Sequence, residues 1–365
     1  LIQKYKPNLI WQNSVLESIH ETPLKLHKSL ALTLSTSGST GDSKQIRLSY
    51  NNIQENASSI AQYLDIDSTE TAITNLPLHY SYGLSILNSH LEIGANIILS
   101  EKSIVDRNFW KLFREKSCTS LAGVPYIYET LKKLRFERME LPALRYLTQA
   151  GGKLDDEYIE YISDYSQNKN IRFFVMYGQT EASPRMSYLP SGMLQSKIGS
   201  IGVPIPGGKF YLVDNEYQIV NEPNIEGELI YEGKNVCMGY ARDCYDLEKN
   251  DFNKGILKTG DMAKVDLDGY YYITGRKKRF LKIFGNRVSL DQIEQKINEA
   301  GYDCACVGTD DCMKIYTTEK SYVQKIQDYI GKYFEINKSG FSIIYINTIP
   351  RNHSGKILYS ELVKN

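Results

Sequence analysis

Apolar residues along the first half of the chain follow two alternating patterns. Short apolar-rich runs at 32–34, 72–76, 96–100, 120–124, 145–149 and 172–176 predict strands. Between them, apolar positions three or four residues apart predict helices at 84–92, 106–116, 127–134 and 155–166. An earlier helix is predicted by Ile53, Ala57, Ile60 and Leu64, with Ser49 as its N-cap. Strands that alternate with helices are typical of an α/β fold in which helices cover layered sheets.

The pattern of apolar and turn-forming residues changes from about residue 198 to residue 274. Short β segments there, such as 227–231 and 269–273, are separated by Gly, Pro, Asn and Asp. This stretch therefore predicts a mostly antiparallel, β-rich subdomain.

A basic run, Gly275-Arg276-Lys277-Lys278-Arg279, precedes the last part of the chain. After it, a Gly285-Asn286 turn predicts a hairpin, and Ser289 with Gln292 predicts a capping box on a helix that Gly301 ends. A strand, a strand, a helix and a strand are predicted to follow. We expect a large domain over 1–277 and a small α+β domain over 278–365. Within the basic run, Lys277 and Arg279 taken singly are typical of a solvated strand edge.

Composition narrows the classes of function. Lys+Arg and Asp+Glu both total 43, so the net charge is zero and nothing favours nucleic acid or an acidic membrane surface as a partner. No apolar run approaches the roughly 20 residues of a membrane helix, and no secretory segment opens the sequence, so we expect a cytoplasmic protein. The six cysteines are too irregular for a disulfide framework, and Cys304 and Cys306 are expected to be buried thiols rather than metal ligands.

The first candidate for chemistry is a loop, Thr36-Ser37-Gly38-Ser39-Thr40-Gly41, that follows a predicted strand, with Lys44 close behind. Amides and hydroxyls in such a loop can donate to phosphate oxygens, and Lys44 adds a positive charge. The loop lacks the Gly-Lys-Ser/Thr ending of a Walker A sequence, which disfavours a P-loop NTPase or kinase. Taken alone, the segment could equally be a flexible polar linker.

Three later segments carry the other residue types that an ATP site needs. A predicted strand delivers Tyr177, Thr180 and Glu181: a ring to cover a purine, a hydroxyl for the α-phosphate and a carboxylate for Mg²⁺. Asp261, in Lys-Thr-Gly-Asp, can accept the hydroxyls of a ribose, although Asp in a turn is commonly only a turn residue. The polar loop at 350–357 holds Lys356 and says little by itself.

Together and in this order, these segments resemble the adenylate-forming superfamily of acyl-CoA synthetases, peptide-synthetase adenylation domains and luciferases. The resemblance runs from about Leu30 to the C-terminus and includes Thr-Gly-Asp, Gly-Arg-Lys-Lys and the terminal Gly-Lys. It implies that a carboxylate attacks the α-phosphate of ATP, giving an acyl-adenylate and pyrophosphate. A thiol of CoA, or of the phosphopantetheine on an acyl carrier protein, then displaces AMP. We therefore expect an AMP-forming acid–thiol ligase that uses ATP and Mg²⁺.

The resemblance also implies roles for single residues in ATP binding. Thr36 to Gly41 and Lys44 would hold the β- and γ-phosphates, while Thr180 would contact the α-phosphate and Glu181 the Mg²⁺. Asp261 would hold the ribose hydroxyls with help from Arg276. The base would lie against these residues: Gly151, Gly152, Lys153, Tyr177 and Gly178.

In the small domain, Lys356 matches the lysine of the family that bridges the carboxylate and the α-phosphate as charge develops. Lys278 falls on the family's hinge. Rotation about it would withdraw Lys356 and bring Lys282, Gly285 and Arg287 toward the site.

The acid pocket is expected beside the segment 77–83. There Tyr80 occupies the position where the family usually has His, and His79 precedes it. The candidate pocket residues are His79, Tyr80, Tyr82, Ser85, Val124 and Ala150. Aromatic residues here are equally typical of a core. No Asp stands where activators of α-amino acids anchor the amine, so ordinary amino acids are disfavoured and the acid itself stays open.

The chain departs from the family at its front. Only 35 residues precede Thr36, whereas the family has roughly 100 or more there, more than half a typical domain. We expect a shortened member or a fragment, with apolar surface that a partner could cover. The alternative function is a nucleotide- or partner-binding module without full turnover. The presence of Thr180, Glu181, Asp261, Arg276 and Lys356 argues against it.

Overall fold

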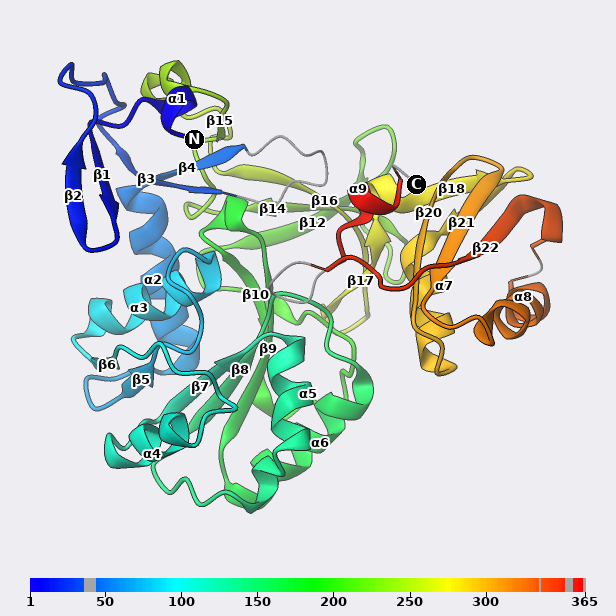
Figure 1. Ribbon diagram of the computed structural model, residues 1–365, viewed down its shortest axis with the longest axis horizontal. Coiled ribbons are helices and arrows are strands. Elements are labelled where there is room, and N and C mark those ends of the chain that lie inside the picture. The colour runs from blue at the N-terminus through cyan, green and yellow to red at the C-terminus, as the bar shows by residue number, and fades with distance from the viewer. Residues whose placement is uncertain (36–43, 335, 352–356, 364–365) are drawn as a thin grey trace. The chain divides into compact units, whose positions relative to one another are not determined.

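The computed structural model describes residues 1–35, 44–334, 336–351 and 357–363 (Figure 1). These residues divide into two compact units. The first unit holds the described residues up to 210 together with 230–257, and the second holds 211–229 and the described residues from 258 onward. The predicted phosphate loop Thr36–Gly41 and the predicted catalytic Lys356 lie outside the described residues.

A seven-stranded sheet with the order β11-β10-β9-β8-β7-β5-β6 forms the centre of the first unit. Strands β5 to β9 run parallel to one another, whereas β10 and β11 are antiparallel to their neighbours. The strands are β5 (Thr71–Ile73), β6 (Asn96–Ile98), β7 (Ser120–Gly123), β8 (Tyr146–Gln149), β9 (Arg172–Gly178), β10 (Arg185–Leu189) and β11 (Val203–Pro204). The predicted alternation of strands and helices over this region is confirmed.

Helices cover both faces of this sheet. Adjacent residues of a strand point to opposite faces, and Phe173 and Phe174 of β9 show which helices lie on each. The ring of Phe174 contacts Tyr63 of α2 with centroids 6.4 Å apart, whereas Phe173 contacts Tyr128 of α5 at 5.4 Å. The helices are α2 (Tyr50–Leu64), α3 (Ser81–Ile93), α4 (Arg107–Glu115), α5 (Pro125–Lys133) and α6 (Asp156–Lys169).

Ser49 caps α2, as predicted. Its hydroxyl accepts from the Asn52 amide at 3.0 Å, and the Asn52 side chain accepts from the Ser49 amide at 2.9 Å. The residues just before this helix form β4 (Gln45–Ser49), a strand that the sequence analysis did not predict. It is buried throughout and pairs with β3 (Leu30–Ser35) and β15 (Tyr240–Ala241).

The β-rich stretch is also confirmed. It contains a five-stranded sheet with the order β13-β12-β14-β16-β17. Its strands are β12 (Lys209–Val213), β13 (Ile219–Val220), β14 (Gly227–Glu232), β16 (Ile256–Val265) and β17 (Tyr271–Arg276).

The hairpin after the basic run pairs β18 (Phe280–Ile283) with β19 (Asn286–Ser289), and its turn lies one residue earlier than predicted. Phe284 and Gly285 occupy the turn with φ values of 48° and 86°. Two positive φ angles are what a tight two-residue hairpin turn needs, and Phe284 is held there because its amide donates to Asp311 at 2.6 Å.

Ser289 caps α7 (Leu290–Glu299) by accepting from the Gln292 amide at 3.3 Å. The predicted capping box is wrong, because the Gln292 side chain donates to the Thr274 carbonyl instead. The remaining elements of the second unit are β20 (Cys304–Thr309), β21 (Cys312–Thr317), α8 (Tyr322–Tyr333), β22 (Phe341–Tyr345) and α9 (Tyr359–Leu362). Their core contains the buried, free thiols of Cys304 and Cys306, as predicted.

The front of the chain forms the short helix α1 (Ile2–Tyr5) and a hairpin of β1 (Leu9–Gln12) and β2 (Val15–Ser18). Trp11 of this hairpin is 70% exposed, so apolar surface is present there as expected. Among the described residues, no helix is both long enough and apolar enough to cross a bilayer.

Candidate active site

The motif segments of the first unit meet at one edge of the seven-stranded sheet. In a parallel sheet the carboxyl ends of the strands lie side by side, and ligands of open α/β sheets bind outside those ends. Here β5 leads to residues 77–83, β7 to Val124, β8 to residues 150–153 and β9 to residues 178–181. The topology therefore brings together four segments that the sequence singled out separately.

Gly151 makes the closest of these contacts possible. Its φ is +88°, and a Cβ built on it would lie 2.5 Å from Tyr80 Oη and 3.1 Å from Val124 Cγ1. A larger residue at position 151 would therefore displace two of the predicted pocket residues. Gln149 supports the same segment, because its side chain donates to the Gly152 carbonyl at 2.8 Å. Predicted residues Tyr80, Val124, Gly151 and Gly152 thus share one location.

The other predicted residues of the acid pocket and the adenine segment differ in burial. Ala150 is fully buried, and so is Tyr82, whose hydroxyl bonds Thr148. The Ser85 hydroxyl is buried against the Tyr82 carbonyl at 2.8 Å. His79, in contrast, is exposed, as is Lys153 of the predicted adenine segment.

Thr180 and Glu181 lie in a short 3-10 helix (Thr180–Ala182) just after β9. The Thr180 hydroxyl is 3.1 Å from that of Ser81. Gly178 must be glycine, since a Cβ there would lie 1.9 Å from the Pro184 carbonyl oxygen. Tyr177 is half-buried, with its ring 6.4 Å from that of Phe210 and its hydroxyl accepting from Gln179 at 3.4 Å.

Tyr240, which the sequence analysis did not single out, contacts two of the predicted site residues. Its hydroxyl donates to Glu181 Oε1 at 2.8 Å, and the Lys44 ammonium lies 5.7 Å from the centre of its ring. Burial, and next the Glu181 carboxylate, raise the pKa of Tyr240, so the phenol stays protonated and remains a donor. Tyr240 connects two predicted residues that are far apart in the sequence.

Whether Mg²⁺ can bind beside Glu181 depends on which oxygen ligands the protein offers there. Among the residues that the structure describes, no three His, Cys, Asp or Glu side chains form a metal cluster. Mg²⁺ commonly takes one or two protein carboxylates and completes its shell with phosphate oxygens and water. A half-buried Glu181 with one oxygen held by Tyr240 fits that pattern.

In the second unit, Asp261 and Arg276 pair across β16 and β17. Arg276 Nε lies 2.6 Å from Asp261 Oδ1, and the carboxylate is almost completely buried while the guanidinium is half-exposed. The Asp261 amide donates to Thr259 Oγ1 at 3.0 Å. The Thr-Gly-Asp segment lies inside β16, so the interpretation of Asp261 as a turn residue is wrong.

The basic run is largely paired inside the second unit. Lys277 lies 2.6 Å from Glu228, and Arg279 bonds Asp291 and Glu294. Arg279 is mostly buried, so its interpretation as a solvated edge residue is wrong. Lys278 and Lys282 are exposed, and the Arg287 side chain lies outside the description.

Comparisons with known proteins agree on one family. The sequence profile of the family described as "AMP-binding enzyme" matches residues 5–241. The 2-succinylbenzoate--CoA ligase of Bacillus mycoides is 25% identical over 97% of this chain and 74% of its own length. The medium-chain fatty-acid--CoA ligase of Escherichia coli is 25% identical over 90% of this chain and 60% of its own length.

Solved structures agree as well. O-succinylbenzoate coenzyme A synthetase from Bacillus subtilis, in complex with AMP, has a TM-score of 0.77 at 22% identity. The match covers 95% of this chain and 72% of that one. An anthranilate CoA ligase in complex with anthranoyl-AMP has a TM-score of 0.72 at 21% identity, over 92% and 66% of the two chains. The mixed α/β fold is thus that of adenylate-forming enzymes, and the chain belongs to the AMP-binding enzyme family.

Proposed function

We propose that this chain activates a carboxylic acid with ATP and transfers the acyl group to the thiol of CoA. The observation that carries the proposal is the convergence of Tyr80, Gly151, Thr180 and Glu181 at the carboxyl ends of neighbouring strands. The relatives named above are CoA ligases, which supports CoA as the acceptor rather than the pantetheine of a carrier protein.

In the first step, an oxygen of the substrate carboxylate attacks the α-phosphorus of ATP. The bond from that phosphorus to the bridging oxygen breaks, and pyrophosphate leaves. Thr180 is assigned to an α-phosphate oxygen, and Glu181, held by Tyr240, to Mg²⁺. When bound, Mg²⁺ neutralises phosphate charge and orients the leaving group.

Asp261 is assigned to the ribose hydroxyls, because a buried carboxylate with one oxygen on Arg276 is fixed in direction before the nucleotide arrives. Lys356, outside the described residues, is assigned to the charge that develops between the carboxylate and the phosphate.

In the second step, the thiolate of CoA attacks the acyl carbon and AMP leaves with the bonding electrons. We assign Lys278 as the hinge between the two steps, and Lys282 and Arg287 to the face used in the second. Because both steps need ATP and CoA, the proposal places the enzyme in the cytoplasm. Five of the six free cysteines are buried, which is compatible with that reducing compartment.

The test is product analysis with ATP, Mg²⁺, CoA and a panel of acids. The proposal predicts acid-dependent formation of AMP and an acyl-CoA in equal amounts, both abolished in Lys356→Ala. ADP as product would contradict it. A protein that binds ATP but forms neither product with any acid would favour the nucleotide-binding module.

A further inference from the structure

Arg47, in the middle of β4, is a buried charge to which the proposed mechanism gives no role. It is 2% exposed, whereas charged side chains are rarely buried unless they are paired. Its guanidinium donates to main-chain carbonyls. Nη2 bonds Met238 at 2.8 Å and Asn250 at 3.2 Å, and Nη1 bonds Lys249. One side chain therefore bridges two stretches of chain, at residue 238 and at residues 249–250.

The backbone of Arg47 holds the first of these stretches as well. Its amide donates to the Gly239 carbonyl at 3.0 Å, and its carbonyl accepts from the Met238 amide at 2.9 Å. The next residue, Tyr240, pairs with Ile46 across β15 and β4. Arg47 thus fixes the chain immediately before Tyr240 through both its backbone and its side chain.

The same stretch contacts Glu181, the predicted Mg²⁺ ligand, on either side of these bonds. The Cys237 amide donates to the Glu181 carbonyl at 2.8 Å, and the Tyr240 hydroxyl donates to Glu181 Oε1 at 2.8 Å. Residues 238 and 239, which lie between those two contacts, are the ones that Arg47 holds. A shift of the segment 237–240 would therefore move both supports of Glu181.

The bridge suits arginine better than lysine. A guanidinium group carries several N–H donors in a fixed planar fork, whereas an ammonium group is a single nitrogen on a flexible stem. Nη1 and Nη2 can therefore reach carbonyls on two stretches at once. Hydrogen bonds from a charged donor are also stronger than those between neutral groups. The bridge fixes residue 238 relative to residues 249 and 250.

We propose that Arg47 is a positioning residue for the binding of Mg²⁺. It holds the segment 237–240 in place, so that the Tyr240 hydroxyl keeps the Glu181 carboxylate in the orientation that binds the metal. This inference rests on the proposed function, in which Glu181 binds Mg²⁺, and adds a buried residue of β4 to that site. Arg47 acts only through Tyr240 and takes no part in the bond changes.

The test measures how tightly Mn²⁺ binds to the complex of the protein with ATP, without any acid. Mn²⁺ takes the same oxygen ligands as Mg²⁺, and the free ion is quantified by its EPR signal. The protein is kept in excess over ATP, so that nearly all nucleotide is bound. Arg47→Met keeps much of the volume but has no N–H donor. It should weaken the binding of Mn²⁺ about 3- to 10-fold, the effect also expected for Tyr240→Phe.

A double-mutant cycle with Tyr240→Phe shows whether Arg47 acts through that tyrosine. If it does, removing Arg47 adds little once the hydroxyl is gone. The double variant should then bind Mn²⁺ within about 2-fold of Tyr240→Phe alone. An arginine that serves only the stability of the fold would instead give two losses that multiply.

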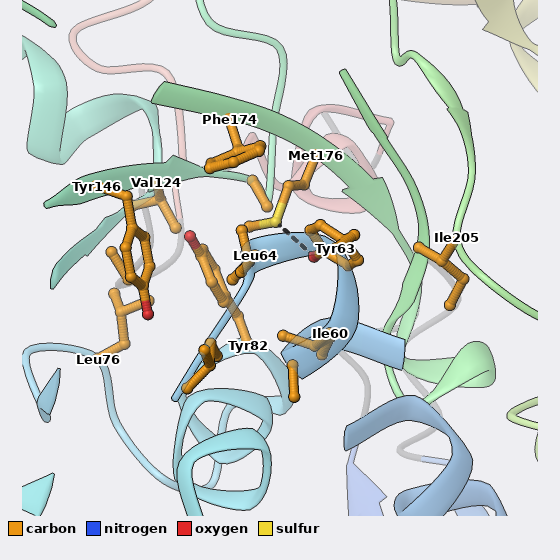
Figure 2. Packing of buried hydrophobic residues seen from close by; sticks show 14 residues of the cluster. Ile60, Tyr63, Leu64, Leu76, Tyr82, Val124, Tyr146, Phe174, Met176 and Ile205 are labelled. Atoms are coloured by element: carbon orange, nitrogen blue, oxygen red, sulfur yellow. Dashed lines mark hydrogen bonds between the residues drawn. The ribbon is translucent and has the colours of Figure 1, made fainter. Parts of the chain in front are cut away.

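A matched control separates positioning from a general loss of stability. Leu64, the last residue of α2, belongs to the buried core of the same unit, where Figure 2 shows it with Tyr63 and Met176. Leu64→Ala removes apolar contacts and should lower the melting temperature, but it should leave the binding of Mn²⁺ unchanged. Arg47→Lys keeps the charge and should bind Mn²⁺ with an affinity between those of wild type and Arg47→Met. If Arg47→Met does not fold, the cycle is carried out with Arg47→Lys.

The inference would be overturned by wild-type affinity for Mn²⁺ in the Arg47 variants, by losses that multiply in the cycle, or by an equal loss in Leu64→Ala. None of these results touches the proposed function, provided that the wild type forms acyl-CoA. A wild type that binds ATP and Mn²⁺ but forms no acyl-CoA with any acid would overturn the proposed function. The cycle would still decide the role of Arg47, because it depends on binding alone.

Discussion

Arg276 Nε lies 2.6 Å from Asp261 Oδ1, and only the arginine of this pair is exposed to solvent. The arrangement presents a carboxylate whose direction is set before any ligand binds. Arg276 also belongs to the basic run, where its amide donates to Asp291 of α7 at 2.8 Å. Arg276 thus connects Asp261, the residue predicted to bind the ribose, with Asp291 in the first turn of α7.

Asp261→Asn should weaken the use of ATP. The amide keeps the shape but loses the charge-assisted bonds to Arg276 and to the ribose, so we expect kcat/KM for ATP to fall about 10- to 100-fold. The substrate dATP lacks the 2′-hydroxyl of the ribose. If Asp261 binds the 3′-hydroxyl, the substitution should lower kcat/KM for dATP as much as it lowers kcat/KM for ATP. Asp268→Asn, which alters an exposed carboxylate of the following turn, is the matched control. Unchanged KM and kcat in Asp261→Asn would refute the ribose assignment.

Tyr240→Phe tests the hydroxyl that holds Glu181. Losing a bond to a charged acceptor typically costs about 1.5 to 3 kcal/mol when the acceptor is buried, and less for the half-buried Glu181. We expect the Mg²⁺ concentration for half-maximal rate to rise about 3- to 10-fold. Tyr245→Phe, at a largely exposed ring, should have no effect. A normal Mg²⁺ dependence in Tyr240→Phe would show that the bond does not orient Glu181.

Gly151→Ala should impair the acid pocket through a steric clash. The added methyl would meet Tyr80 Oη at 2.5 Å, and the positive φ adds strain of its own. Gly94→Ala is the control for strain alone, because Gly94 has a φ of +71° with open space around it. The Gly151→Ala variant should lose far more activity than Gly94→Ala, measured as kcat/KM for the acid. Tyr80→Phe, which removes the clashing oxygen, should restore part of it. Equal losses in the two glycine variants would argue against the clash.

The buried His90 predicts a dependence of stability on pH. Burial lowers its pKa in the folded protein, whereas the unfolded chain titrates near the ordinary value of about 6.5. Below that pH the unfolded state binds more protons than the folded state, so the free energy of unfolding should decline as pH falls through about 6.5. Urea unfolding from pH 5 to pH 8 measures this. His90→Gln should flatten the slope between pH 5 and 6.5. An unchanged slope would mean that His90 is not the group responsible.

Local patterns accounted for the large features of the fold. The strand and helix order from β5 to β9, the Ser49 cap and the buried Cys304 and Cys306 all follow from spacing within a few residues. The strand β4 was missed because its polar Arg47 is buried by distant carbonyls, such as that of Met238 at 2.8 Å.

The residues of the candidate site likewise fall into those that a local motif indicates and those that only tertiary packing brings in. Motif residues Thr180, Glu181 and Asp261 could be named from the sequence, because their neighbours in the chain carry the pattern. Tyr240 could not, since it reaches Glu181 from 59 residues away. Such contacts follow from tertiary packing, which no local spacing encodes.

The central claim, ATP-dependent activation of an acid, is tested most directly by exchange of labelled pyrophosphate into ATP without CoA. The account predicts exchange that depends on a carboxylic acid and on Mg²⁺ and is lost in Lys356→Ala. Absence of exchange with every acid in a protein that binds ATP, or exchange that persists without any acid, would contradict it.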